Sequence, residues 1–119
     1  MEWDAFLSER PIGVLATVGA DGFPHAVPVE VVVRDGLVYA WAESDSVKVR
    51  NVRRENRAAM LAYKGNSGTL VRGAARLLTA EDPSYEAITR AFLEKYQREE
   101  IFGNDTLIEI SPERTSVWE

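Results

Sequence analysis

Hydrophobic and polar positions alternate over most of this chain, and the alternating segments are separated by short turns. Six segments have the length and alternation of β-strands: residues 12–18, 25–34, 37–43, 57–64, 69–78 and 106–111, with 115–118 as a candidate extension of the last. Asp35-Gly36 is typical of a type I′ hairpin turn, and the first three strands are therefore predicted to form an antiparallel meander. Six mostly antiparallel strands favour a small closed or partly closed barrel, because closure removes exposed sheet edges. We therefore predict a mainly β fold.

Three segments have helical periodicity instead. They are residues 2–9, 47–54 and 85–99, and Gly103-Asn104 is expected to break the last. Pro11 is expected to end the first helix. Asp45 and Ser46 would supply capping oxygens to the second, and Asp82 would cap the third. The predicted architecture thus has a short helix after the third strand and a longer helix before the last strand.

Length and composition fit a single domain over residues 1–119. The 119 residues are 45% hydrophobic and 28% charged, which excludes a disordered chain. There is no cysteine and only one histidine, His25, so we expect no disulfide, no metal site and no Ser-His-Asp triad. No apolar run approaches the ~20 residues that span a bilayer, and the N-terminus is acidic where a signal peptide is basic. We therefore expect a cytoplasmic protein with no membrane partner.

The net charge of −5 hides a segregation of charge along the chain. Residues 46–76 carry a net charge of +7, and the remainder carries −12. The basic residues of this segment are Lys48, Arg50, Arg53, Arg54, Arg57, Lys64, Arg72 and Arg76, and its single acid is Glu55. Because the protein is acidic and this segment lacks interleaved aromatic residues, we expect no nucleic-acid partner. The function is sought in the basic segment first.

The predicted helix at residues 47–54 begins with the features of a phosphate site. A helix start presents unpaired N–H groups and a partial positive charge. Here Ser46 adds a hydroxyl and Lys48 adds an ammonium group. Cations at a helix start oppose the helix dipole, so a helix with a purely structural role would tend to avoid Lys48. The alternative, which the residues alone leave open, is a solvated basic face.

The predicted strand at residues 25–34 contains two further candidates. Pro28 removes a ladder donor, which indicates a bulge, an edge, or backbone open to a ligand. Glu30 is either a buried acid with a raised pKa or, as we favour, the ion-pair partner of Arg72 or Arg76.

Three other features favour structural roles. Trp41 and Trp118 are expected to pack in the barrel or at an interface, and His25 is expected to be a surface or hydrogen-bonded residue. Segment 72–76, with an arginine at each end, fits a dimer interface as well as a phosphate-facing strand.

Four stretches of the chain carry a family resemblance. They are residues 11–17 (PIGVLAT) followed by Asp21-Gly22-Phe23-Pro24 and Pro28-Val29, residues 46–54 (SVKVRNVRR), residues 68–77 (GTLVRGAARL), and Ser111-Pro112-Glu113-Arg114 through Trp118. In this order they resemble the pyridoxamine-phosphate-oxidase-like split-barrel flavoproteins, and especially the flavin/deazaflavin oxidoreductases, some of which use FMN and others coenzyme F420. The resemblance implies a six-stranded antiparallel split β-barrel, a homodimer, and a cofactor in each of two grooves at the subunit interface.

The resemblance also assigns nine cofactor-binding residues. They are Ser46, Val47 (through its backbone) and Lys48 for the phosphate, Pro28, Val29 and Glu30 for the ring, and Trp41, Ala42 and Glu43 for the ring and ribityl chain. The chain departs from the family at Asn56, where many relatives have proline, and at Ser46, where several have Arg or Thr. It also ends without the additional Arg and His with which pyridoxamine phosphate oxidases bind substrate, so we do not expect vitamin B6 oxidation.

The function implied by the resemblance is redox chemistry. We expect an FMN- or F420-dependent oxidoreductase that passes hydride to or from a small unsaturated or quinone-like substrate, with position and electrostatics supplied by the protein. No catalytic acid or base is assigned to a side chain. The alternatives are a non-enzymatic flavin-binding carrier or sensor, and a haem-binding split-barrel protein with His25 as its axial ligand. The sequence does not decide between FMN and F420, because both present a phosphate to the same cradle.

Overall fold

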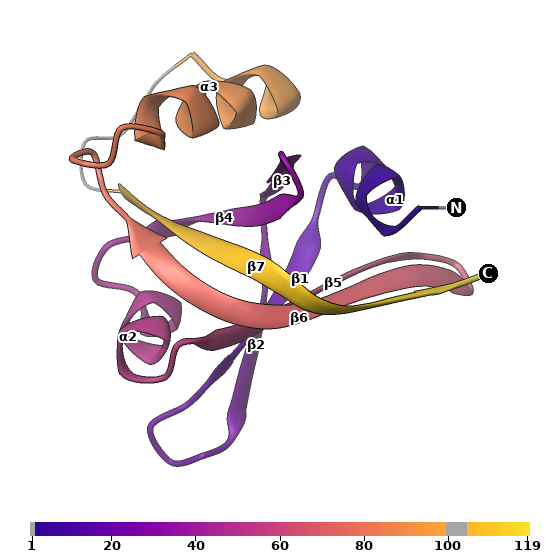
Figure 1. Ribbon diagram of the computed structural model, residues 1–119, viewed down its shortest axis with the longest axis horizontal. Helices are drawn as coiled ribbons and strands as arrows, with labels where there is room; N and C mark the ends of the chain where they lie inside the picture. The colour runs from indigo at the N-terminus through magenta and orange to yellow at the C-terminus, as the bar shows by residue number, and fades with distance from the viewer. Residues whose placement is uncertain (1, 100–104) are drawn as a thin grey trace.

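The computed structural model describes residues 2–99 and 105–119, which form three helices and one seven-stranded sheet (Figure 1). The elements are α1 (Trp3–Glu9), β1 (Gly13–Val18), β2 (Pro24–Val29), β3 (Val31–Arg34), β4 (Leu37–Glu43), α2 (Val47–Arg54), β5 (Arg57–Lys64), β6 (Ser67–Leu78), α3 (Tyr85–Tyr96) and β7 (Asp105–Trp118). The predicted helix at 47–54 and the predicted strands at 37–43 and 57–64 are confirmed residue for residue. The extension at 115–118 is also confirmed, because β7 runs to Trp118 without interruption. The expected break at Gly103-Asn104 lies outside the described residues.

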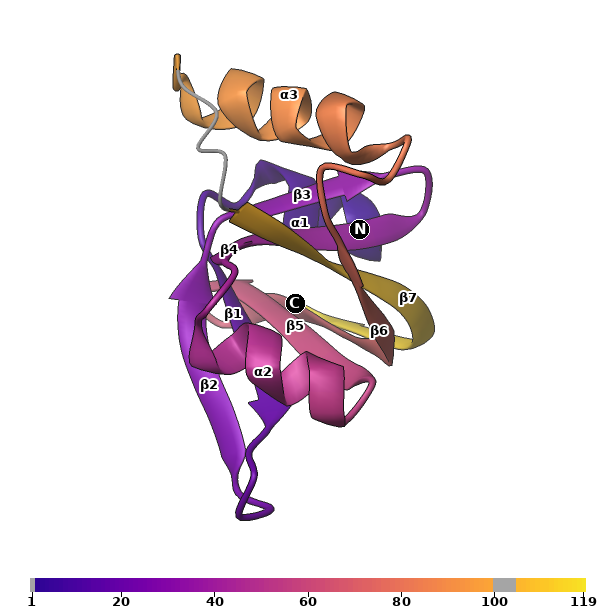
Figure 2. The ribbon, with the colours of Figure 1, turned by 90° about the vertical axis from the view of Figure 1, so that its left-hand side faces the viewer.

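The sheet curls so that its two edges approach each other. Its strand order is β2-β1-β5-β6-β7-β4-β3, and every neighbouring pair is antiparallel. The edge strands β2 and β3 follow each other in the chain and are separated only by Glu30. In Figures 1 and 2, the long strands β6 and β7 bend across the molecule and give the sheet its curvature. The result is the partly closed, mainly β barrel that the sequence predicts.

The predicted strand at residues 25–34 is two strands in the structure. β2 pairs with β1 up to Val29, whereas β3 pairs with β4 from Val31 onward. The chain therefore leaves one edge of the sheet and enters the other at Glu30, and the strand count becomes seven instead of six. The alternation of faces continues through this break, since Val29 and Val31 both pack in the main core. Periodicity alone therefore could not reveal it.

Two hydrophobic clusters hold the elements together. The main core gathers side chains from the strands and from α1 and α2, including Leu7, Leu15, Val49, Met60 and Ile108. The second cluster lies under α3 and consists of Val32, Tyr39, Leu78, Tyr85, Ile88, Phe92 and Leu107. Burial of a large apolar side chain contributes roughly 1.5–3 kcal/mol, so this second cluster fixes α3 on the outer side of β3, β4 and β7 (Figures 1 and 2). In the part of the chain that the structure describes, no helix is long and apolar enough to cross a membrane.

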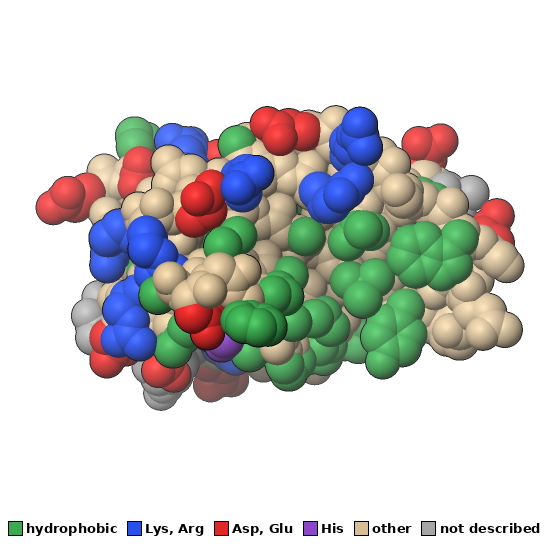
Figure 3. Space-filling view, turned by 90° about the horizontal axis from the view of Figure 1, so that it is seen from below, with side chains coloured by type: hydrophobic (Ala, Val, Ile, Leu, Met, Phe, Trp, Pro, Cys, Tyr) green, Lys and Arg blue, Asp and Glu red, His purple; other side chains and the backbone are tan. Residues whose placement is uncertain are grey.

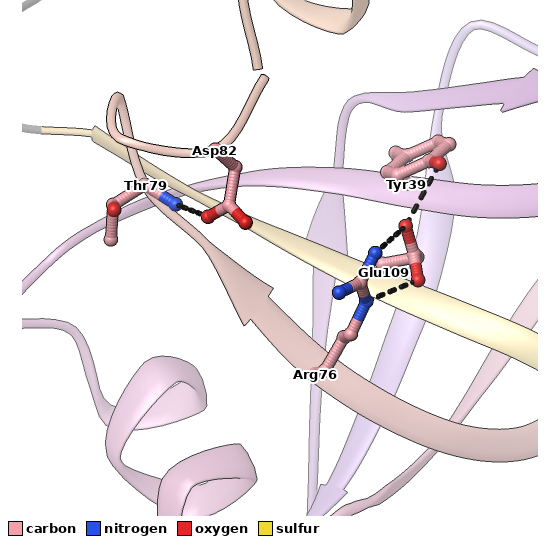
Figure 4. Close-up of polar contacts among 5 residues, drawn as sticks. All are labelled: Tyr39, Arg76, Thr79, Asp82 and Glu109. Carbon is pink, nitrogen blue, oxygen red and sulfur yellow. Dashed lines mark hydrogen bonds and ion pairs between the residues drawn. The ribbon is translucent and has the colours of Figure 1, made fainter. Parts of the chain in front are cut away.

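The turns confirm one local prediction and correct another. Asp35 and Gly36 have φ angles of 53° and 76°, as the type I′ turn requires. The cap expected from Asp82 is wrong, because its carboxylate accepts a hydrogen bond from the Thr79 N–H at 2.9 Å and so closes the turn before α3 (Figure 4). Ser84 occupies the N-cap position of α3.

Candidate functional site

A cavity of about 350 Å³ opens where the two edges of the sheet approach each other. Its walls come from the β2–β3 break, the end of β4, the start of α2, the residues after α3 and the start of β7. The lining residues are Pro28, Val29, Glu30, Trp41, Ala42, Glu43, Lys48, Arg98 and Asp105. Seven of the nine residues assigned by the resemblance are among them, whereas Ser46 and Val47 are not. The structure thus brings together residues from three separate elements and adds two that the sequence did not indicate.

The start of α2 lies directly after the cavity-lining end of β4. The Ser46 N–H donates to the Glu43 carbonyl oxygen at 3.0 Å, and the Arg50 N–H donates to the Ser46 carbonyl oxygen at 3.1 Å. This short connection leaves only two residues between the end of the strand and the N-cap. As a result Lys48, the second residue of α2, lies in the cavity wall.

The Ser46 hydroxyl is a buried polar group beside this helix start. Ser46 occupies the N-cap position, but its side chain makes no capping bond, so the predicted side-chain cap is wrong. Its Oγ is buried and has no hydrogen-bond partner among the described residues. An unpaired buried hydroxyl costs about 1–3 kcal/mol. A phosphate would supply the missing partner and would also accept hydrogen bonds from the helix-start N–H groups and Lys48.

In the part of the chain that the structure describes, the cavity wall carries three carboxylates and two cations. Glu43 and Asp105 lie directly opposite each other in the β4–β7 ladder, where like charges are destabilising. One carboxylate oxygen of Asp105, Oδ2, is buried and has no partner among the described residues. The cavity therefore offers an acceptor for a hydroxyl or N–H group of a ligand.

Glu30 is ion-paired, but the predicted partners are wrong. Its Oε2 lies 2.7 Å from Nη2 of Arg98. Arg76 instead donates to Glu109, with distances of 2.7 and 3.3 Å (Figure 4). Arg72 lines a different cavity, of about 590 Å³, which contains none of the predicted site residues. The true partner of Glu30 depends on where α3 ends in space, which the sequence pattern does not show.

Arg98 and Asp105 are the two lining residues that the sequence analysis missed. Arg98 follows α3 and Asp105 begins β7, so both are distant in sequence from the remaining lining residues. No local motif marks either residue. Asp105 could have been found only from the pairing of β4 with β7, which sets it opposite Glu43.

Burial perturbs two ionisable groups at the end of α3. It lowers the pKa of Lys95 to about 8, although the neighbouring Glu30 carboxylate acts in the opposite direction. It also raises the pKa of Tyr96, against a hydrogen bond with the backbone of Val31. Both side chains lie next to the β2–β3 break through their contacts with Val31.

Both tryptophans contact a neighbouring element, although Trp118 is 41% exposed. Trp41 meets Phe92 edge-on at a centroid distance of 5.3 Å, and the Arg98 guanidinium lies 5.5 Å from its ring centroid. The ring of Trp118 packs against Gly68. His25 lies opposite Thr17 in the β1–β2 ladder and does not line the cavity.

The family follows from comparison with known proteins. The family model described as pyridoxamine 5'-phosphate oxidase matches residues 1–119. The chain therefore belongs to the pyridoxamine 5'-phosphate oxidase-like split-barrel family. No match was found among curated proteins.

Solved structures share the fold over almost the whole chain. A conserved hypothetical protein of Mycobacterium tuberculosis is 26% identical with a TM-score of 0.82, covering 97% of this chain and 81% of its own. A putative pyridoxamine 5'-phosphate oxidase of Listeria innocua is 26% identical with a TM-score of 0.79, covering 95% of this chain and 92% of its own. An F420 reductase is 19% identical with a TM-score of 0.79, covering 98% of this chain and 97% of its own.

Proposed function

We propose that this protein binds FMN or coenzyme F420 in the cavity at the β2–β3 break and acts as an oxidoreductase. The observation that carries the proposal is the helix start of α2, where the buried Ser46 hydroxyl has no hydrogen-bond partner among the described residues and Lys48 lines the cavity. Lys48 itself forms no ion pair among the described residues. This donor set fits a phosphate, and the family makes a flavin-type cofactor the natural source of that phosphate.

Three groups of residues would hold the cofactor. The Lys48 ammonium, the Ser46 hydroxyl and the N–H groups at the start of α2 bind the phosphate. Main-chain groups of Pro28 to Glu30 line the ring, and residues 41–43 border the ring and the ribityl chain. Oδ2 of Asp105, which has no partner among the residues that the structure describes, would accept a hydrogen bond from a ribityl hydroxyl.

The bound ring would supply hydride chemistry, which none of the side chains can provide. The residues that line the cavity would orient the ring toward a small unsaturated or quinone-like substrate. No lining side chain is assigned as a proton donor, so solvent supplies the proton. Oxidation of a reduced cofactor by a quinone, followed by absorbance, separates an enzyme from a carrier that binds without turnover.

The proposed oligomer is a homodimer with the cavity at the subunit interface. Hydrophobic side chains gather over the right-hand half of the face shown in Figure 3, and a monomer rarely exposes a large patch of this kind. Phe23 and Tyr63 are 73% and 62% exposed. Sedimentation equilibrium is expected to give twice the chain mass, and a monomer at micromolar concentration would contradict this part of the proposal.

The binding test compares two lysines of the basic segment. Lys48→Ala removes the ammonium group from the cavity wall and is expected to weaken FMN or F420 binding at least about tenfold. Lys64→Ala is the matched control, because Lys64 is an exposed lysine that lies outside the cavity. Titration of the purified protein with each cofactor separately, followed by absorbance and fluorescence, measures both. Equal affinity of Lys48→Ala and the unaltered protein would exclude the phosphate assignment.

A further inference from the structure

The end of α3 contacts the chain at the point where the barrel is split. Lys95 and Tyr96 of α3, together with Arg98 just after the helix, reach Glu30 between β2 and β3 and Val31 at the start of β3. This segment is also where the chain passes from one sheet edge to the other. The residues at the end of α3 therefore contact the β2–β3 break where Glu30 lines the cavity.

Side chains of α3 satisfy the main chain of Val31. Its N–H donates to the Tyr96 hydroxyl oxygen at 2.7 Å, and its carbonyl oxygen accepts from Lys95 Nζ at 2.6 Å. The Tyr96 hydroxyl donates in turn to the Pro11 carbonyl oxygen at 2.7 Å. Val31 is fully buried on an edge strand, so these groups have no partner strand on their outer side. One tyrosine hydroxyl thus ties the start of β3 to the chain before β1.

Arg98, just after α3, contacts two residues that line the cavity, Glu30 and Trp41. Its guanidinium is 2.7 Å from Glu30, and the two side chains are only 39% and 21% exposed. The same guanidinium lies over Trp41, whose ring also packs against Phe92 of α3. Glu30 and Trp41 both line the cavity.

We propose that Lys95, Tyr96 and Arg98 are positioning residues, which hold the Glu30–Val31 segment and thereby set the shape of the cavity for its ligand. The proposal rests on the proposed function, because the shape of the cavity affects binding only if a cofactor ring binds there. Without the Tyr96 hydroxyl the Val31 N–H loses its partner, and the main chain of residues 28–30 can shift with it. Binding geometry tolerates displacements of only about 0.5 Å, so a small shift is enough to weaken binding.

Tyr96→Phe tests the hydroxyl directly. The variant keeps the ring that stacks on Phe92 at a centroid distance of 6.2 Å. Tyr39→Phe is the matched control, because it removes a buried hydroxyl that donates to Glu109 outside the cavity. We expect Tyr96→Phe to bind FMN, or F420 if the unaltered protein takes only that cofactor, about tenfold more weakly. We also expect a shifted visible absorption maximum of the bound cofactor, and neither change in Tyr39→Phe.

The outcomes separate this inference from the proposed function. If the unaltered protein binds neither cofactor, the proposed function is wrong. If the unaltered protein binds and Tyr96→Phe binds with the same affinity and spectrum, only the positioning role is wrong. Equal losses of cofactor affinity in Tyr96→Phe and Tyr39→Phe, with unchanged spectra, also overturn the positioning role. A general loss of stability would then explain both variants.

Arg98 supplies a second pair of variants if Tyr96→Phe does not fold. Arg98→Met removes the charge that pairs with Glu30, and Arg98→Lys keeps a cation at this place. Arg98→Met is expected to weaken binding and shift the spectrum, and Arg98→Lys is expected to restore most of both. Identical behaviour of these two variants and the unaltered protein would refute the positioning role of the ion pair.

Discussion

Replacement of Arg76 should destabilise the fold far more than replacement of Arg72, although both arginines lie on the exposed face of β6. Arg76 donates two hydrogen bonds, at 2.7 and 3.3 Å, to Glu109, which is only 4% exposed. Among the described residues, the remaining donor to that carboxylate is the Tyr39 hydroxyl at 2.9 Å (Figure 4). Burial and this hydrogen bond raise the pKa of Tyr39 well above its ordinary value, so the hydroxyl remains a donor at neutral pH. Without Arg76, the buried carboxylate therefore keeps one neutral partner.

The size of the effect depends on how deeply each side chain of the Arg76–Glu109 ion pair is buried. Removing one member of a fully buried ion pair costs about 3–5 kcal/mol. The Arg76 side chain is 63% exposed, so water replaces part of its contribution. We therefore expect Arg76→Ala to lower the free energy of unfolding by about 2–3 kcal/mol. Arg72→Ala breaks no ion pair among the described residues. It should therefore change the free energy of unfolding by less than about 0.5 kcal/mol.

Urea unfolding at pH 7, followed by far-ultraviolet circular dichroism, measures both variants. The double variant Arg76→Ala/Glu109→Gln gives a further check, because the glutamine carries no charge and its side-chain carbonyl still accepts from Tyr39. It should be no less stable than Arg76→Ala alone. An Arg76→Ala variant as stable as Arg72→Ala, or a double variant less stable than Arg76→Ala alone, would refute the reasoning.

Three further predictions concern α3, the glycines of β6 and the cavity. Because the pKa of Lys95 is lowered to about 8 from an ordinary 10.5, the unfolded chain binds more protons between these values, and stability should rise with pH from 8 toward 10. Lys95→Met should abolish this rise in urea unfolding at pH 7.5, 8.5 and 9.5. Gly73→Ala should lower the free energy of unfolding by about 3 kcal/mol or more, because the added methyl group would meet the main chain of β7. Gly68→Ala should lower it by only about 1 kcal/mol, because its methyl group would meet the movable indole of Trp118. Thermal unfolding compares the two variants. Asp105→Asn should raise the free energy of unfolding by about 0.5 kcal/mol, because it removes the charge opposite Glu43. The same variant should bind the cofactor more weakly in the titration. A stabilised variant with undiminished affinity would exclude Asp105 from the site.

The sequence predicts the elements whose boundaries are set by neighbouring residues. The hairpin at Asp35-Gly36 depends on positive φ angles within two residues, and the structure has them. The helix at 47–54 and the strands that flank it are found because periodicity and the lack of glycine and proline in the helix are local properties. The two errors in capping, at Ser46 and Asp82, have one cause. Sequence shows that a polar oxygen is present near a helix start, but it does not show which N–H group the side chain meets.

The features that sequence could not reveal depend on which strands become neighbours. The break at Glu30 leaves the alternation intact and changes only the pairing partner, from β1 to β4. Asp105 enters the cavity wall because β7 pairs with β4, and Arg98 enters it because the second hydrophobic cluster places α3 over β4. A family resemblance assigned the nine predicted site residues, of which Ser46 and Lys48 were also indicated by the helix start itself. Their role with a cofactor stays a prediction. That seven of them line one cavity supports it.

The split in the barrel itself explains why a site forms at this place. If β2 paired with β3, the outward N–H and C=O groups of both edge strands would be satisfied. The two strands instead follow each other directly in the chain, and each pairs with a different neighbour. Pro28 has no N–H to offer a partner strand. The structure satisfies Val31 through α3, whereas residues 28–30 face the cavity. Main chain that no strand covers is available to a ligand, and Lys48 and Arg98 line the same cavity. The basic segment therefore favours one small anionic ligand over a long polyanion, because several of its arginines already bind within the chain: Arg54 to a β1 carbonyl, Arg57 to Glu55 and Arg76 to Glu109.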